Sequence, residues 1–356
     1  MFNKVKKIIK QIIRNRGKKK DKINVLSSSH QVMVYKVGKE FDYKKHGFSL
    51  YESVLFNLNK NDYHEYISTW EAYQPRYNLS EYHKISDDKY LFSIVFGKYI
   101  ETPVSYGLIN DGIIEPLSPE LQKDCLYDFL IKKSGGVIKD RFGYNGYNIY
   151  VFKVIDNYLF YRDKQISKTD LDEIVLNFNR GLIQSIITQG AFENSIYNKS
   201  INTIRLITIK KEGTVEHEAV CAVQRIGSDR CAPVDNFSQG GYSSLINLET
   251  GELGPITSPM SKDAEMNQIF YDKHPDNGIQ VKGKIIPNWQ NIKQQVVDLT
   301  RKIPFYNYVA WDIVLKDDGI AVIEINMKSS LCVVQVHGGM RNTKMGEAYK
   351  RMHYLK

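Results

Sequence analysis

The sequence predicts an α+β protein whose C-terminal half is largely antiparallel sheet. Segments rich in β-branched residues come in pairs joined by short glycine-containing turns, above all at 308–326. Amphipathic segments with helical spacing separate these pairs. The composition is that of an ordinary globular protein, with 42% hydrophobic and 25% charged residues. The 356 residues are enough for one large domain or two to three lobes with an ample core.

The N-terminal half is predicted to be helical at first and then mixed. Candidate helices lie at 30–45, 50–60, 62–73 and 87–100, the last with Ser86 or Asp87 as its cap. The next expected elements are a strand–turn–strand at 103–116, a helix at 121–136 that ends at a glycine pair, a strand–loop–strand at 135–154, and a helix at 168–179 that starts at Thr169 or Asp170.

The C-terminal half is predicted to be mainly strands. The expected elements are a buried strand at 181–189, a strand–turn–strand at 201–227, a loop and hairpin at 234–254, a helix at 288–304, and a hairpin at 308–326 around Asp317-Asp318-Gly319.

The net charge of +9 is concentrated at the N-terminus. Residues 1–22 contain ten Lys or Arg and one acid, whereas the remainder has equal numbers of bases and acids. A helix at 1–24 would gather its apolar residues on one face, which predicts attachment to an anionic membrane surface; they are Phe2, Val5, Ile8, Ile9, Ile12 and Ile13. A solvated tail, or a docking helix for a protein partner, is the alternative.

Other locations and partners are less compatible with the sequence. No apolar run at the N-terminus is long enough to span a bilayer, and no secretory signal pattern follows it. A neutral body predicts no nucleic-acid partner. The four cysteines stand far apart without a CxxC pair, which favours a reducing cytoplasm and no structural zinc. We therefore expect a cytoplasmic protein, peripheral at the inner face of the cell membrane.

The strongest chemical signal is a set of oxygen ligands on the 308–326 hairpin. Asp312 lies on its first strand, and Glu324 and Asn326 lie on its second. Antiparallel pairing would bring Asp312 near Glu324, and Asn326 would share a face with Glu324. The strands are hydrophobic, and a buried carboxylate pair without a cation is unfavourable. Hard oxygen ligands suit Mg²⁺, so we predict a metal site rather than a solvated polar face.

Weaker signals favour phosphate binding. Lys139 ends a strand and is followed by Gly143 and Gly146, which would let backbone N–H groups approach a phosphate. Arg205 and Arg225 suit bidentate binding of carboxylate or phosphate, although either is compatible with a structural ion pair. The Walker A order, a nucleophile elbow, HExxH and GxGxxG are absent.

In their order along the chain, these pieces resemble the ATP-grasp superfamily, and within it the sugar-transfer-associated branch of bacterial surface-polysaccharide gene clusters. The resemblance runs from about residue 85 to 340. The carriers are Asp88-Lys89, Val137-Ile138-Lys139 with the glycine loop, Asn202-Thr203-Ile204-Arg205, Gln224-Arg225-Ile226-Gly227, Asp235-Asn236 through Gly240-Gly241, His274-Pro275 with Gly278, Pro287 with Trp289, and Trp311-Asp312 to Glu324-Ile325-Asn326.

The resemblance implies an ATP-grasp fold with two α+β lobes clasping ATP. The N-terminal lobe would span 86–180 and the C-terminal lobe with the metal site 181–356, preceded by a helical region at 25–85. Lys89 and Lys139 would contact ATP, and the strand around 182–187, with Gln184 and Ile187, would bind adenine. Asp312, Glu324 and Asn326 would hold Mg²⁺, and Arg205 or Arg225 would neutralise the γ-phosphate or an acyl phosphate.

The sequence departs from the family pattern at three places. Asp140 follows Lys139 where the family often has proline, Gln189-Gly190 stands where Gln-His is common, and Met327-Lys328-Ser329-Ser330 follows Asn326 without the usual Pro-Gly loop. The last region should contact the acceptor. Lys328, Gln335 and His337 are the acceptor-binding candidates.

The resulting hypothesis is an ATP- and Mg²⁺-dependent carboxylate–amine ligase acting through an acyl phosphate. Its partners would be a uronic-acid-containing sugar or lipid-linked saccharide of a capsule or O-antigen, and an amino acid or small amine. The alternatives are kinase-like phosphoryl transfer to a sugar hydroxyl on the same fold, and a non-catalytic membrane-attached scaffold of polysaccharide assembly.

Overall fold

A computed structural model describes residues 41–77, 82–143, 148–327 and 329–355. The helix expected at 1–24 and most of the helix expected at 30–45 lie outside these residues. The chain divides into two compact units. Among the described residues, the smaller unit comprises 41–77, Ser261–Ile269 and 329–355, and the larger comprises 82–143, 148–260 and Phe270–Met327.

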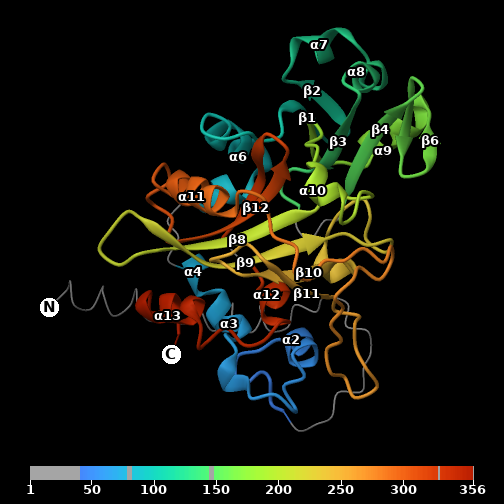
Figure 1. Cartoon of the computed structure of the whole chain (residues 1–356). Helices are drawn as coiled ribbons and strands as arrows, with labels where there is room; N and C mark the ends of the chain where they lie inside the picture. Colours follow the sequence, from blue (N-terminus) through green and yellow to red (C-terminus); the bar gives the residue numbers. More distant parts are fainter. Residues whose placement is uncertain (1–40, 78–81, 144–147, 328, 356) are drawn as a thin grey trace, which may run out of the picture. The chain divides into compact units, whose positions relative to one another are not determined.

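The larger unit contains a seven-stranded antiparallel sheet in the order β2-β1-β7-β3-β4-β5-β6 (Figure 1). Its strands are β1 (Ser105–Asn110), β2 (Ile113–Pro116), β3 (Gly135–Asp140), β4 (Ile149–Ile155), β5 (Tyr158–Tyr161), β6 (Lys164–Ile166) and β7 (Arg180–Gln184). The helices α7 (Pro119–Lys123), α8 (Leu126–Lys132) and α9 (Lys168–Leu176) contribute to its core. Because side chains alternate along a strand, Ile138 enters that core and Lys139 points to the opposite face.

A second sheet in the same unit has six antiparallel strands in the order β11-β10-β9-β8-β12-β13 (Figure 1). Its strands are β8 (Thr203–Lys210), β9 (His217–Ile226), β10 (Tyr242–Ile246), β11 (Leu253–Thr257), β12 (Tyr308–Lys316) and β13 (Gly319–Asn326). Residues of α6 (Lys89–Phe96) and α11 (Trp289–Thr300) join its core, which includes the buried Trp311. The unit also contains α5 (His83–Asp87), α10 (Ala191–Asn194) and η2 (Phe237–Gln239).

The smaller unit is built of short helices. They are α2 (Leu50–Leu55), η1 (Tyr63–Glu65), α3 (Thr69–Ala72), α4 (Gln74–Tyr77), α12 (Cys332–Gln335) and α13 (Lys344–Arg351). Buried polar contacts join its distant segments. Gln335 bonds to both backbone groups of Ile67, and Arg341 pairs with Glu71 at 2.5 Å.

Two long helices expected from the sequence differ in the structure. The helix expected at 87–100 is shorter, since α6 runs from Lys89 to Phe96, and its cap is Asp88 rather than Ser86 or Asp87, because the extended backbone of Asp88 (φ −110°, ψ 105°) lets its side chain bond to the first turn. The segment 121–136 is divided at Asp124, which is also extended and separates α7 from α8. The helix expected at 168–179 is capped by Ser167 rather than started at Thr169, because Ser167 and Asp170 form a capping box.

The lobe boundary expected at residue 180 lies at the start of β7. The structure places β7 between β1 and β3, so its residues belong to the first sheet. Local sequence carries no information on which sheet a buried strand joins, since that depends on pairing with distant strands. Within the described residues, no helix combines the length and hydropathy needed to cross a bilayer.

Candidate active site

The hairpin of β12 and β13 brings the predicted metal ligands together. Asp312 and Glu324 are directly opposite in the antiparallel register, and Asn326 is paired with Ala310. The Asn326 Nδ2 donates to Glu324 Oε1 at 2.9 Å and lies 3.5 Å from Asp312 Oδ2. The three side chains therefore share one face of the second sheet.

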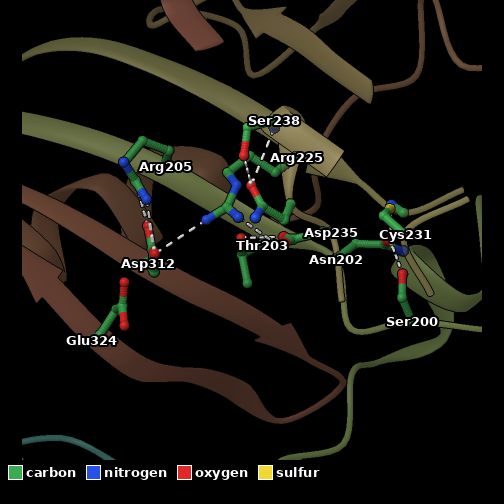
Figure 2. Close-up of polar contacts among 12 residues, drawn as sticks. Ser200, Asn202, Thr203, Arg205, Arg225, Cys231, Asp235, Ser238, Asp312 and Glu324 are labelled. Carbon is green, nitrogen blue, oxygen red and sulfur yellow. Dashed lines mark hydrogen bonds and ion pairs between the residues drawn. The ribbon is translucent and has the colours of Figure 1, made fainter. Parts of the chain in front are cut away.

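Two arginines hold the Asp312 carboxylate (Figure 2). Arg205, opposite Asp312 on the neighbouring strand β8, donates from Nε to Oδ1 and from Nη2 to Oδ2 at 2.9 Å. Arg225 on β9 donates from Nη1 to Oδ2 at 3.1 Å. Both predicted phosphate-binding arginines thus lie beside the predicted metal ligands.

Arg225 is shared with a second carboxylate (Figure 2). Its Nη2 donates to Asp235 Oδ1 at 2.7 Å, and Thr203 donates its hydroxyl to the other Asp235 oxygen. Asp235 lies on the loop that follows β9 and is 6% exposed. The sequence marked Asp235 as part of a motif, but its role as an anchor for Arg225 is visible only in the structure.

The lysines predicted to bind phosphate lie close to Glu324. Lys89 Nζ is 4.0 Å from Glu324 Oε2 and donates to the Gly143 carbonyl at 2.5 Å. Burial, assisted by the neighbouring charge of Lys89, lowers the pKa of Lys139 to about 8. Glu324 would have a raised pKa from burial alone, but Lys89, the Asn326 hydrogen bond and Arg205 together lower it to about 2.

The loop after Lys139 is shaped by Asp140. The Asp140 side chain accepts from Phe142 N at 2.8 Å, which forms a tight turn where the family often has proline. A Cβ on Gly143 would lie 2.8 Å from the Asp140 Cβ, so the turn requires glycine there. Gly146, the second glycine predicted for this loop, lies outside the described residues.

A contact that the sequence did not reveal connects this loop to α6. Arg141 donates from Nε and Nη2 to the two oxygens of Asp88, at 2.8 and 2.5 Å. Lys89 N also donates to the Arg141 carbonyl at 3.2 Å. The first turn of α6 and the loop after β3 are therefore fastened together, and Lys89 lies at their junction.

The predicted adenine-binding residues are in or near β7. Gln184 pairs with Ser105 and Val137, and its amide donates to Pro103 O and Ser105 Oγ. Ile187 follows β7 and packs with Val314 and Ala321. Both side chains are buried, and their contact with adenine stays a prediction.

Two of the three acceptor-binding candidates, Gln335 and His337, lie in the smaller unit. Gln335 is 1% exposed, and its amide is engaged on both sides, accepting from Ile67 N at 2.7 Å and donating to Ile67 O at 2.8 Å. These bonds show that Gln335 anchors the chain segment at Ile67, and its contact with an acceptor stays a prediction. Burial lowers the pKa of His337 to about 4, so its ring is neutral at pH 7. Lys328 lies outside the described residues.

The donor set around Asp312 fits Mg²⁺. Two carboxylates and one amide offer the hard oxygen atoms that this ion prefers, and the neighbouring arginines are groups that bind phosphate oxygens. No cluster of three or more His, Cys, Asp or Glu side chains suited to a metal occurs in the described part of the chain.

A family model described as sugar-transfer associated ATP-grasp matches residues 68–347. The two antiparallel sheets are therefore those of an ATP-grasp protein, which confirms the fold class predicted from the sequence. More narrowly, the chain belongs to the sugar-transfer associated ATP-grasp family. ATP-grasp proteins typically use ATP and Mg²⁺.

Three similar solved structures are all ligases. PsnB, an ATP-grasp ligase complexed with a minimal precursor, is 15% identical with a TM-score of 0.39, covering 78% of this chain and 63% of that one. L-amino acid ligase from Bacillus licheniformis is 12% identical (TM-score 0.39; 75% and 48% covered). D-alanine–D-alanine ligase from Bacillus anthracis is 12% identical (TM-score 0.38; 75% and 67% covered).

The chain spans less than two thirds of the length of PsnB and of the L-amino acid ligase. None of the curated proteins matches it in sequence.

Proposed function

We propose that this protein is an ATP- and Mg²⁺-dependent carboxylate–amine ligase that acts through an acyl phosphate. The observation that carries the proposal is the gathering of Asp312, Glu324 and Asn326 on one sheet face, next to Arg205 and Arg225. These are the groups that phosphoryl transfer requires, because the protein must mainly position the phosphates and stabilise their charge.

The chemistry proceeds in two displacements. A substrate carboxylate oxygen attacks the γ-phosphorus of ATP, and the bond to the bridging oxygen breaks to release ADP. The nitrogen of an amine then attacks the carbonyl carbon, phosphate leaves, and the amine loses a proton. Bound Mg²⁺ would supply charge neutralisation at the phosphates.

The residues of the chain have distinct parts in this proposal. Asp312, Glu324 and Asn326 hold the metal, and Lys89 and Lys139 bind phosphate oxygens. Arg205 and Arg225 neutralise the transferring phosphoryl group, since a guanidinium forms paired hydrogen bonds with phosphate. Gln184 and Ile187 border adenine, and Gly143 and Gly146 allow the loop to approach the phosphates.

The substrate proposal is a sugar carboxylate. The sugar-transfer association of the family supports a saccharide, and the acyl-phosphate reaction requires a carboxylate, which a hexuronic acid provides. We propose that a capsule or O-antigen unit, nucleotide- or lipid-linked, is amidated by an amino acid or small amine. Lys328, Gln335 and His337 remain the acceptor-binding candidates.

A location at the inner face of the cell membrane completes the proposal. Its support is the excess of basic residues in 1–22, together with the helical spacing of the apolar residues in the same segment. Co-sedimentation of the full chain with phosphatidylglycerol vesicles, but not with phosphatidylcholine vesicles, is the expected result. Equal sedimentation after deletion of residues 1–22 would disprove the assignment to this segment.

The ligase proposal is tested by trapping the acyl phosphate. With Mg²⁺, ATP, a uronate and hydroxylamine, we expect ADP, phosphate and a hydroxamate, detected by mass spectrometry. Asp312→Asn and Glu324→Gln should abolish the product. Asp318→Asn, in the exposed turn of the same hairpin, should not. A phosphorylated sugar without hydroxamate would indicate a kinase instead, and no ATP consumption across a panel of uronates and amines would contradict both.

A further inference from the structure

Arg205 and Arg225 bind the same Asp312 oxygens that a metal would need. We infer that these arginines occupy the metal-binding oxygens of Asp312 until a phosphate chain binds the arginines, so that the metal enters only together with nucleotide. This inference rests on the proposed function and concerns the order in which the site fills.

Both oxygens of Asp312 are engaged in the structure (Figure 2). Arg205 approaches them side-on with two N–H groups, and Arg225 adds a third donor to Oδ2. Asp312 is only 2% exposed, so solvent does not compete for these positions. Three donors from two cationic guanidinium groups therefore compete with a metal cation for the lone pairs of Asp312.

The Asn326 amide is also turned away from metal binding. Its neighbours at 2.9 and 3.5 Å are carboxylate oxygens, which only accept hydrogen bonds. The Asn326 group that faces them must accordingly be the NH₂, and the oxygen that a metal would use points elsewhere. Metal binding requires this amide to rotate as well as the arginines to leave.

Charge explains why the exchange must be concerted. Four cationic side chains (Lys89, Lys139, Arg205 and Arg225) face three carboxylates (Asp235, Asp312 and Glu324). Removing one partner of a buried ion pair leaves an uncompensated charge, which destabilises strongly. If a metal replaces the arginines at Asp312 while phosphate oxygens replace Asp312 at the arginines, every charge remains paired.

Asp235 would hold Arg225 in the site after Arg225 leaves Asp312. Arg225 stays bonded to Asp235 through Nη2 when its Nη1 leaves Asp312, so it remains close to the site. The phosphate chain and the metal then favour each other's binding. By thermodynamic linkage, each must raise the affinity of the other by the same factor.

The test is direct Mn²⁺ binding to the full-length protein, measured by electron paramagnetic resonance. Wild type alone should bind Mn²⁺ weakly, and wild type with AMPPNP should bind it tightly. Adenosine, which lacks phosphates, should not promote binding. Arg205→Gln should raise the affinity for Mn²⁺ in the absence of nucleotide by about 5- to 150-fold, the usual range of a coupling between two sites.

Two further variants control for charge and folding. Arg205→Lys keeps one cation at the site, so its gain in Mn²⁺ affinity should be smaller than that of Arg205→Gln. Arg301→Gln removes an exposed arginine that pairs with Glu216 and Asp298, and should match wild type. If Arg205→Gln fails to fold, Arg225→Gln without nucleotide provides the same test, because it also removes a donor to Asp312 Oδ2.

The outcomes separate the two proposals. Equal Mn²⁺ affinity of wild type and Arg205→Gln without nucleotide would overturn the arginine inference and leave the ligase proposal intact. Tight Mn²⁺ binding to wild type with adenosine would do the same. Absence of Mn²⁺ binding even with AMPPNP would reject the metal site, and with it the proposed function.

Discussion

Lys139 illustrates how one side chain's surroundings set the pH range in which a site works. Burial and the charge of Lys89 lower its pKa to about 8 from an ordinary value of 10.5. The free protein therefore carries this charge below pH 8 and loses it above. A phosphate contact that depends on the charge should weaken as the pH rises through that value.

We accordingly predict that MgAMPPNP binds wild type about tenfold more weakly at pH 9 than at pH 7, because one charge-assisted hydrogen bond is lost. In Lys139→Arg the affinity should be nearly independent of pH, since a guanidinium stays protonated. Isothermal titration calorimetry measures both, with the exposed Lys153→Arg as the control. A pH-independent affinity in wild type would refute this role for Lys139.

Asp235 contacts no proposed ligand, but its substitution should disturb the site through Arg225. Asp235→Asn removes the anionic partner of Arg225 and of the Thr203 hydroxyl. We predict a loss of about 3 kcal/mol in the free energy of unfolding, measured with denaturant, because the buried charge of Arg225 loses one of its two carboxylate partners. Asp229→Asn, on the same loop but in an exposed ion pair with Lys199, should lose less than about 1 kcal/mol.

At the scale of elements, α6 and the loop after β3 are joined by Asp88 and Arg141. Asp88 caps α6 through Tyr90 N and Leu91 N and receives both donors of Arg141. Lys89, the next residue, bonds to the loop at the Arg141 and Gly143 carbonyls. The position of one predicted phosphate ligand thus depends on a contact between two elements.

Arg141→Gln tests this dependence. We predict that the KM for ATP rises about tenfold with a smaller change in kcat, because Lys89 and the loop lose their fixed separation. Arg141→Lys should not restore the KM, since an ammonium cannot bond both oxygens of Asp88. Arg162→Gln, an exposed arginine near Tyr161, is the control. An unchanged KM in Arg141→Gln would show that the ion pair serves stability alone.

At the scale of the whole molecule, each compact unit contains one deeply buried glutamate. Glu52 in the smaller unit accepts from the Thr69 hydroxyl, and Glu193 in the larger accepts from Gln224 Nε2 at 3.0 Å. Burial is the main cause that raises the pKa of each to about 8, from an ordinary value of 4.5. Each folded unit therefore holds a proton that the unfolded chain releases above pH 4.5.

This difference in proton binding predicts how stability changes with pH. Between about pH 5 and 8 the folded state binds more protons, so these groups lower the free energy of unfolding as the pH rises, by up to about 1.4 kcal/mol per pH unit each. Glu52→Gln and Glu193→Gln should each reduce that slope. Hydrogen exchange at pH 6 and 8 should place the Glu52 effect in the smaller unit and the Glu193 effect in the larger. Slopes unchanged by both substitutions would mean that neither group holds its proton.

The sequence by itself determined the β12–β13 hairpin and the face shared by Asp312, Glu324 and Asn326, because strand alternation and a glycine turn are local properties. It also determined the α+β class and the family resemblance. Asp88 as a helix cap was harder to identify, since Ser86, Asp87 and Asp88 are neighbouring candidates with similar propensity.

The pairing of the site and anchoring residues depends on tertiary contacts between distant parts of the chain. Arg205 and Asp312 are 107 residues apart, Arg141 and Asp88 are 53 apart, and Gln335 and Ile67 are 268 apart. The same arginine suits a phosphate, a surface carboxylate or a buried one, and the same glutamine suits a substrate or a backbone. Which partner a side chain has depends on which distant strand or loop packs beside it, and no local sequence pattern encodes that packing.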